Sequence, residues 1–122
     1  MNIISFNDYD IQKTVETNGD YLNSFINVVN PTLNSIVIST QDWCPQWHTL
    51  NGWIKELKNQ KCELTVILII YNKSKYFREF MFFKENFWKN DLVPYIRYYK
   101  KGIFSGESNL IDYETFIKKS LS

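Results

Sequence analysis

The chain has 122 residues, of which 44% are hydrophobic and 17% aromatic, so it carries enough apolar material for one packed core. Lysine and arginine number 14 against 13 for aspartate and glutamate. This balance creates no broad field that would attract a nucleic-acid backbone or an anionic lipid surface. We therefore expect a single domain over residues 1–122, with no nucleic-acid partner and no membrane partner.

The chain also lacks the marks of an exported or membrane-spanning protein. Its amino terminus has no basic start, long apolar stretch or small-residue cleavage site of a secretory signal. The longest apolar run, Leu64 to Tyr71, is far shorter than the roughly 20 residues that span a bilayer. Two cysteines fit a reducing compartment better than a disulfide-stapled secreted fold. We expect a cytoplasmic protein.

The first third of the chain is the more polar part. Residues 3–6 favour a short edge strand, and residues 7–19 fit either a strand or a helix. Asp20 is a candidate N-cap for a helix that ends before Pro31. The apolar face of this helix would carry Leu22, Phe25, Ile26 and Val29.

The pattern changes from strand to helix between residues 35 and 57. Ser35 to Thr40 is a β-branched run, typical of a buried strand. A helix is then predicted to begin near Cys44, with Pro45 in its first turn, where no amide donor is missed. Gly52 within it suggests a kink or a close-packing point. The apolar side chains that recur at helical spacing are Trp47, Leu50, Ile54 and Leu57.

Residues 64–89 predict a central strand and an aromatic helix. Leu64 to Tyr71 is apolar without alternation, as in a parallel strand covered on both faces, and the order strand, helix, strand implies a right-handed crossover. Residues 75–89 favour a helix that is apolar over more than one face. A longer loop could cover the excess, or the helix could form a homodimer or partner interface.

The last thirty residues predict a hairpin followed by a helix. Two short strands, 93–99 and 103–105, flank a turn at Lys101 and Gly102. Asp112 is a candidate N-cap for a C-terminal amphipathic helix. The apolar positions of that helix are Tyr113, Phe116, Ile117 and Leu121.

Two motifs in this framework resemble the thioredoxin family. The first is Trp43-Cys44-Pro45-Gln46-Trp47 at the start of a helix, and the second is Val93-Pro94 entering a β-hairpin. The resemblance covers about the last two-thirds of the chain, and the first third only by position. It implies an α/β fold of three layers, α/β/α, with a mixed central sheet and a C-terminal hairpin plus helix. It also implies a cis Val93–Pro94 bond that lies against the cysteine, with Val93 pairing with a bound peptide.

The chain departs from the family at the residues that carry dithiol chemistry. Thioredoxins use a Cys-X-X-Cys pair, but Trp47 stands at the position of the second cysteine. The family's buried acid and its strand lysine are matched here by Ile38 and Leu68. Cys62 cannot replace the missing thiol, because about 15 helical residues at ~1.5 Å each would put it on the order of 20 Å from Cys44. Cys62 is interpreted as a structural or incidental thiol.

Cys44 is the strongest candidate nucleophile. A thiol at a helix N-terminus faces unpaired amide donors and the positive end of the helix dipole, which favour the thiolate. The alternative is an inherited but idle cysteine. His48 could add positive charge if it faces inward, although the matching family position usually faces solvent.

Two functions follow from these residues. The first is monothiol exchange, in which Cys44 forms a mixed disulfide that a protein thiol or a low-molecular-weight thiol must resolve. The second is a non-catalytic module that binds a partner protein through an apolar groove. Trp47 could instead fill the core beside Leu50 and Ile54. The candidate substrate-binding residues are Trp43, Pro45, Trp47, Val93 and Pro94.

We expect no cofactor and no bound metal. With one histidine and two separated cysteines, the chain has no metal set of ordinary spacing. The carboxylates show no pairing pattern, and no glycine-rich phosphate loop or serine-hydrolase elbow is present. Examples of these carboxylates are Asp8, Asp10, Glu63 and Asp91.

Overall fold

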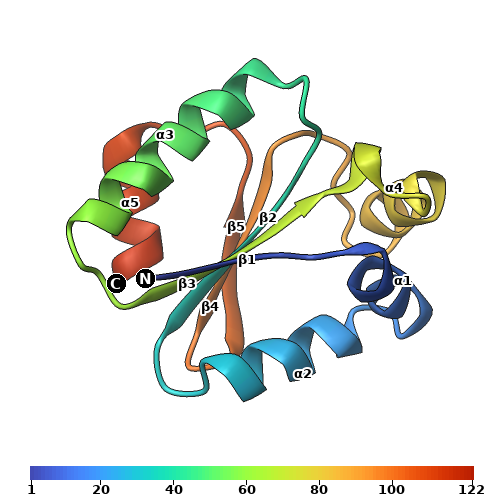
Figure 1. The fold of residues 1–122 in the computed structure, drawn as a ribbon, viewed down its shortest axis with the longest axis horizontal. Coiled ribbons are helices and arrows are strands. Elements are labelled where there is room, and N and C mark those ends of the chain that lie inside the picture. Colours follow the sequence, from blue (N-terminus) through green and yellow to red (C-terminus); the bar gives the residue numbers. More distant parts are fainter.

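The computed structural model describes residues 1–122 as one five-stranded sheet between two layers of helices (Figure 1). The strand order is β1-β3-β2-β4-β5. The first three strands of the chain run parallel to one another, and the last two form an antiparallel hairpin beside β2. The strands are β1 (Asn2–Ser5), β2 (Asn34–Thr40), β3 (Leu64–Ile70), β4 (Tyr95–Lys100) and β5 (Ile103–Ser108).

The helices divide between the two faces of the sheet (Figure 1). Helices α3 (Pro45–Asn59) and α5 (Tyr113–Leu121) cover one face. The opposite face is covered by α1 (Asp8–Glu16), α2 (Asp20–Val29) and α4 (Phe77–Asn86). A short 3-10 turn, η1 (Tyr71–Lys73), links β3 to α4. The expected three-layer α/β/α fold with a mixed sheet is confirmed. None of the helices is long and apolar enough to cross a membrane.

Alternating side chains of the central strands build two separate cores. Val37 and Ile67 point toward α1, α2 and α4, whereas Ile36 and Val66 point toward α3 and α5. All four side chains are fully buried. This explains why β3 reads as an unbroken apolar run, since both of its faces are covered by helices.

The N-terminal third contains one more helix than the sequence pattern predicts. Residues 8–16 form α1, whose start is fixed by a reciprocal capping box between Asn7 and Asp10. The prediction of Asp20 as N-cap is wrong, because Gly19 occupies that position with φ of 91° and Asp20 is the first helical residue. The tight turn between α1 and α2 needs this left-handed backbone, which glycine adopts without a steric penalty.

The hairpin and the last helix form as predicted. Lys101 and Gly102 both have positive φ, 51° and 80°, which is the two-residue turn that suits the twist of paired strands. Strand β5 continues to Ser108, three residues beyond the predicted end. Asp112 caps α5, and its carboxylate accepts a hydrogen bond from the amide of Thr115 at 2.7 Å.

Helix α4 is shorter than the predicted span of 75–89, and most of its apolar side chains are covered by the chain itself. Phe80, Phe83 and Trp88 lie in the core beneath α1 and α2, whereas Phe82 and Phe87 remain exposed. Edge-on aromatic contacts join Trp88 to Phe80 and Phe83. The intramolecular packing therefore accounts for the apolar excess, and the structure gives no support to a homodimer through this helix.

Candidate functional site

Cys44 lies where the loop after β2 enters α3. It is the N-cap residue of that helix, and Pro45 is the first helical residue, as the sequence predicts. The side chain of Cys44 is only 1% exposed. Its Sγ lies 3.3 Å from Oε1 of Gln46 and 3.7 Å from the carbonyl oxygen of Val93, the two acceptors available to its single S–H proton. The structure thus brings Cys44 together with the Val93–Pro94 segment.

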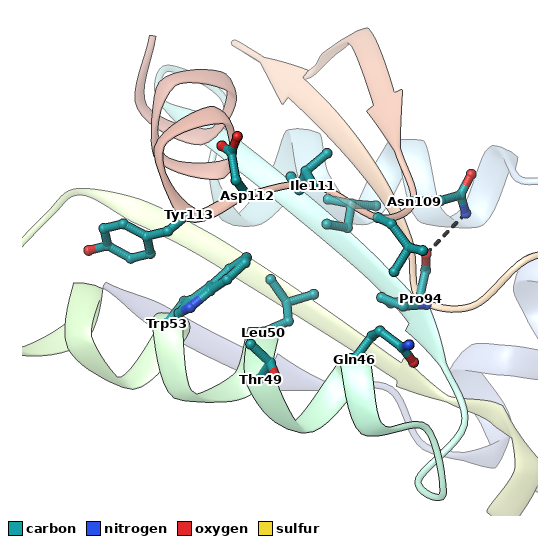
Figure 2. Close-up of a pocket in the computed structure, with 11 residues that line it drawn as sticks. Gln46, Thr49, Leu50, Trp53, Pro94, Asn109, Ile111, Asp112 and Tyr113 are labelled. Atoms are coloured by element: carbon teal, nitrogen blue, oxygen red, sulfur yellow. Dashed lines mark hydrogen bonds between the residues drawn. The ribbon is translucent and has the colours of Figure 1, made fainter.

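The Val93–Pro94 segment leads directly into β4, and its peptide bond is cis. Val93 is half-buried and packs against both cores, while Pro94 is buried. Pro94 is held from the other side by Asn109, whose Nδ2 donates to the Pro94 carbonyl oxygen at 3.0 Å (Figure 2). The segment is therefore fixed between the thiol of Cys44 and the loop after β5.

Trp47 is a core residue and does not line the groove. It is 4% exposed and packs among the side chains between α3 and the sheet. Its helical phase explains this position, because Trp47 shares one face of α3 with Leu50 and Ile54. The prediction of Trp47 as an apolar anchor is therefore wrong, and the alternative of a core-filling residue is confirmed. Gly52 is exposed with no atom near its missing side chain, so it is not a close-packing point.

Trp43, in contrast, stands on the surface beside the thiol. Its side chain is 62% exposed, and its Nε1 donates to Oε1 of Gln41 at 2.6 Å. The neighbouring Asp42 is tied to η1, because its carboxylate accepts from Asn72 at 2.6 Å and pairs with Lys73 at 3.1 Å. The hydrogen bond from Asn72, with a further one from Lys73, lowers the pKa of Asp42. This anchoring presents Trp43 on a fixed loop.

The ionisable assistants of dithiol chemistry are absent around Cys44. Ile38 and Leu68 lie directly opposite each other on β2 and β3 and belong to the same apolar cluster as Cys44. His48 faces solvent, and its Nε2 lies 2.7 Å from the carbonyl oxygen of Asp42. The Sγ of Cys44 therefore makes no hydrogen bond to an ionisable side chain.

Cys62 lies beyond the far end of α3 and is half-buried. Its Sγ donates to the carbonyl oxygen of Leu57 at 3.0 Å. The 15 residues of α3 separate the two cysteines by about 20 Å at ~1.5 Å per residue, far beyond disulfide reach. Both cysteines are free.

A groove of about 310 Å³ lies between α3 and the loop after β5 (Figure 2). Cys44 does not line it, but Gln46, which does, accepts a hydrogen bond from Cys44 Sγ. One wall is α3, with Gln46 at the end nearest the thiol and Trp53 further along. The other wall is Pro94 and the loop that joins β5 to α5, residues 109–112. Sequence reasoning missed this loop, because its residues form no motif and meet α3 only through the tertiary fold. The groove has polar groups at its rim and an apolar floor that includes Leu50 and Ile96.

Large apolar side chains remain exposed around this site. Trp43 precedes the thiol, Leu92 precedes the Val93–Pro94 segment, and Leu110 lies in the loop that lines the groove. Each of the three is more than half exposed. Of the three, Leu110 lines the groove, whereas Trp43 and Leu92 lie next in sequence to Cys44 and Val93. No cluster of three or more candidate metal ligands occurs in the chain.

No protein-family model matches the chain, and no curated protein matches it. Among solved structures, it is similar to thioredoxin O1 from Arabidopsis thaliana in the oxidized state, with a TM-score of 0.67, 14% identity and full coverage of both chains. Thioredoxin from Schistosoma mansoni gives a TM-score of 0.62 at 14% identity, over 98% of this chain and 93% of the other.

A third similar structure comes from work on the thiol resolving mechanism of a yeast mitochondrial 1-Cys peroxiredoxin through glutathione and thioredoxin systems. Its TM-score is 0.64 at 11% identity, over 97% of this chain and 92% of the other. Similarity over nearly the whole of each chain, at such low identity, establishes the architecture alone. The chain therefore has the thioredoxin fold.

Proposed function

We propose that this protein takes part in thiol–disulfide exchange, with Cys44 as its only nucleophile. The observation that carries the proposal is the position of Cys44 Sγ, at the N-terminus of α3 and 3.7 Å from the carbonyl oxygen that precedes cis Pro94. A helix N-terminus supplies free amide donors that can stabilise a thiolate. Similarity of fold to thioredoxins supports the same class of chemistry.

The exchange needs two thiols that the chain does not hold. The thiolate of Cys44 attacks one sulfur of a partner disulfide, so that a Cys44–partner S–S bond forms and the old S–S bond breaks. The departing sulfur leaves as a thiolate and takes up a proton. A first external thiol, from a protein or a small molecule, attacks the Cys44 sulfur of the mixed disulfide, releases the partner's second sulfur as a thiol and leaves Cys44 joined to the external sulfur. A second external thiol then attacks that external sulfur, frees Cys44 and forms an S–S bond between the two external sulfurs. The two external thiols are oxidised and the partner disulfide is reduced, which suits a reducing setting such as the cytoplasm.

The groove supplies the means of selecting a partner. Its apolar floor and the exposed Trp43, Leu92 and Leu110 fit an extended peptide segment that carries an apolar residue near its disulfide. Gln46 lines this groove and also accepts the hydrogen bond from Cys44 Sγ. A bound segment that displaces Gln46 would therefore also uncover the thiol.

A second candidate function is a peptide-binding module without chemistry. The burial of Cys44 favours it, since at 1% exposure the sulfur cannot be reached until Gln46 or the Val93–Pro94 segment moves. In this function the groove and its apolar surroundings bind the partner, and Cys44 only fills space at the start of α3.

The two candidates are separated by reduction of insulin disulfides with dithiothreitol as the external thiol. We expect the unchanged chain and Cys62→Ser to accelerate the reduction to the same extent. Cys44→Ser should fall to the uncatalysed rate, because it lacks the only nucleophile. Cys62→Ser is the matched control, since it removes the other thiol of the chain.

If the unchanged chain gives no acceleration, the exchange function is contradicted. The binding module is then tested by titrating the Cys44→Ser variant with reduced insulin B chain, used as an extended apolar peptide. If Cys44→Ser binds the peptide as tightly as the unchanged chain, and Leu110→Ser binds it more weakly, the groove serves binding alone.

A further inference from the structure

Lys84 is a buried lysine in α4 without a carboxylate partner. Its side chain is 1% exposed, and it takes no part in either salt bridge of the structure. Its Nζ donates to the carbonyl oxygen of Leu92 at 2.6 Å, to that of Asn90 at 3.1 Å and to Oδ1 of Asn90 at 3.3 Å. All three ammonium protons thus bind the loop that leads to Val93 and Pro94.

The contacts of Lys84 continue through Asn90 to the groove. Nδ2 of Asn90 donates to Oδ1 of Asn109 at 2.9 Å, and Nδ2 of Asn109 donates back to Oδ1 of Asn90 at 3.1 Å. Asn109 also holds the carbonyl oxygen of Pro94 (Figure 2). One polar network therefore connects α4, the segment before β4 and the loop after β5.

A charge in this position is expensive for the fold. Removing an ammonium group from water costs free energy that only good hydrogen bonds can offset, and a methionine would fill the same space without that cost. The nearby charges are the carboxylates of Glu85 and Asp91, neither of which forms a salt bridge with Lys84, and its Nζ also lies 5.5 Å from the ring centre of Tyr95. Stability alone thus gives a weak reason for a lysine here.

We infer that Lys84 is a positioning residue, which holds residues 90–94 against Cys44 and so shapes the groove in which a partner peptide binds. The inference rests on the proposed function, because it concerns the same segment. Lys84 lines no part of the groove and does not contact the thiol. It acts through Leu92 and Asn90, whose carbonyl oxygens accept its hydrogen bonds and which precede Val93 and Pro94 in the same segment.

The test compares Lys84→Met with Lys55→Met, a matched change at an exposed lysine of α3. The first readout is hydrogen exchange at the Leu92 amide, which donates to Oδ1 of Asn90 at 3.1 Å. We expect Lys84→Met to speed this exchange about tenfold or more without affecting the amides of β2, because only the loop is released. Lys55→Met should change neither.

The second readout separates positioning from a merely structural role. Exchange of Cys44 with a peptide disulfide should slow about tenfold in Lys84→Met, since the misplaced segment no longer orients the peptide. Exchange with a small disulfide should change less than about threefold, because it does not need that segment. The side-chain amide of Lys84→Gln keeps two hydrogen-bond donors, so this variant should recover part of the rate of exchange with the peptide disulfide. If Lys84→Met does not fold, Lys84→Gln is measured in its place.

Unchanged Leu92 exchange in Lys84→Met, or equal slowing with peptide and small disulfides, would overturn the inference. If Cys44 exchanges with no disulfide in any variant, the proposed function fails. The Leu92 amide then still decides whether Lys84 holds the segment, so the two failures are distinguishable.

Discussion

Replacing Trp47 with cysteine should destabilise the domain by about 3 to 5 kcal/mol, although it restores the Cys-X-X-Cys spacing. Trp47 is 4% exposed and fills the space between α3 and the sheet, so cysteine would leave a large cavity. The measurement is urea unfolding under reducing conditions, where no new disulfide contributes. Trp43→Cys is the matched control, and at 62% exposure it should cost less than about 1 kcal/mol.

The size of this loss shows whether a thiol can be accommodated at position 47. A loss of less than about 1 kcal/mol in Trp47→Cys would contradict the core position of Trp47. The expected large loss would mean that a dithiol site cannot be rebuilt here by one substitution. A neighbouring core residue such as Leu50 or Ile54 would have to become larger to fill the cavity.

The domain should gain stability as the pH rises from 8 to 10, by about 2 kcal/mol. Burial lowers the pKa of Lys84 from 10.5 to about 8. In this window the unfolded chain still holds the proton that the folded chain has released, so raising the pH favours the folded state. The stability from this group is therefore fully present above the unfolded pKa of 10.5 and is lost as the pH falls from there toward the folded pKa of about 8.

Above pH 10 the trend should reverse because of buried tyrosines. Burial raises the pKa of Tyr95 from 10 to about 12, so the unfolded chain loses the phenolic proton first. Chemical denaturation at intervals from pH 7 to 11 measures both limbs. Lys84→Met should abolish the rise and keep the fall, and a rise that persists in this variant would show that another group causes it.

Local patterns were sufficient to predict most of the fold. The unbroken apolar run of β3 and the helical spacing of Leu50, Ile54 and Leu57 are set by short-range periodicity, and tertiary packing agrees with it. The sequence of residues 7–19 fits a strand or a helix, because the capping box of α1 pairs Asn7 with an aspartate, a weaker sequence signal than a glutamate or glutamine at that position. Gly19, and not Asp20, is the N-cap of α2, because the turn between α1 and α2 needs a residue with positive φ just before the helix.

The site was less predictable, because distant residues define it. The expectation that Cys44 lies beside Val93 and Pro94 comes from the resemblance to a family, because no local sequence pattern indicates it. The sequence is compatible with a Trp47 side chain either in the groove or in the core, and the structure shows that it lies in the core. The network of Lys84, Asn90 and Asn109 gives no sequence signal, since it joins common polar residues 6 and 19 positions apart through the fold.

The most direct test of Cys44 as the nucleophile is the mass of the folded chain after incubation with glutathione disulfide. We predict a single mixed disulfide in the Cys62→Ser variant, located on Cys44 by peptide mapping and removed by excess thiol. The folded Cys44→Ser variant, which keeps Cys62, should not catalyse reduction of a disulfide by an external thiol. Absence of the adduct from folded Cys62→Ser, or modification of the unchanged chain at Cys62 alone, would contradict the exchange function.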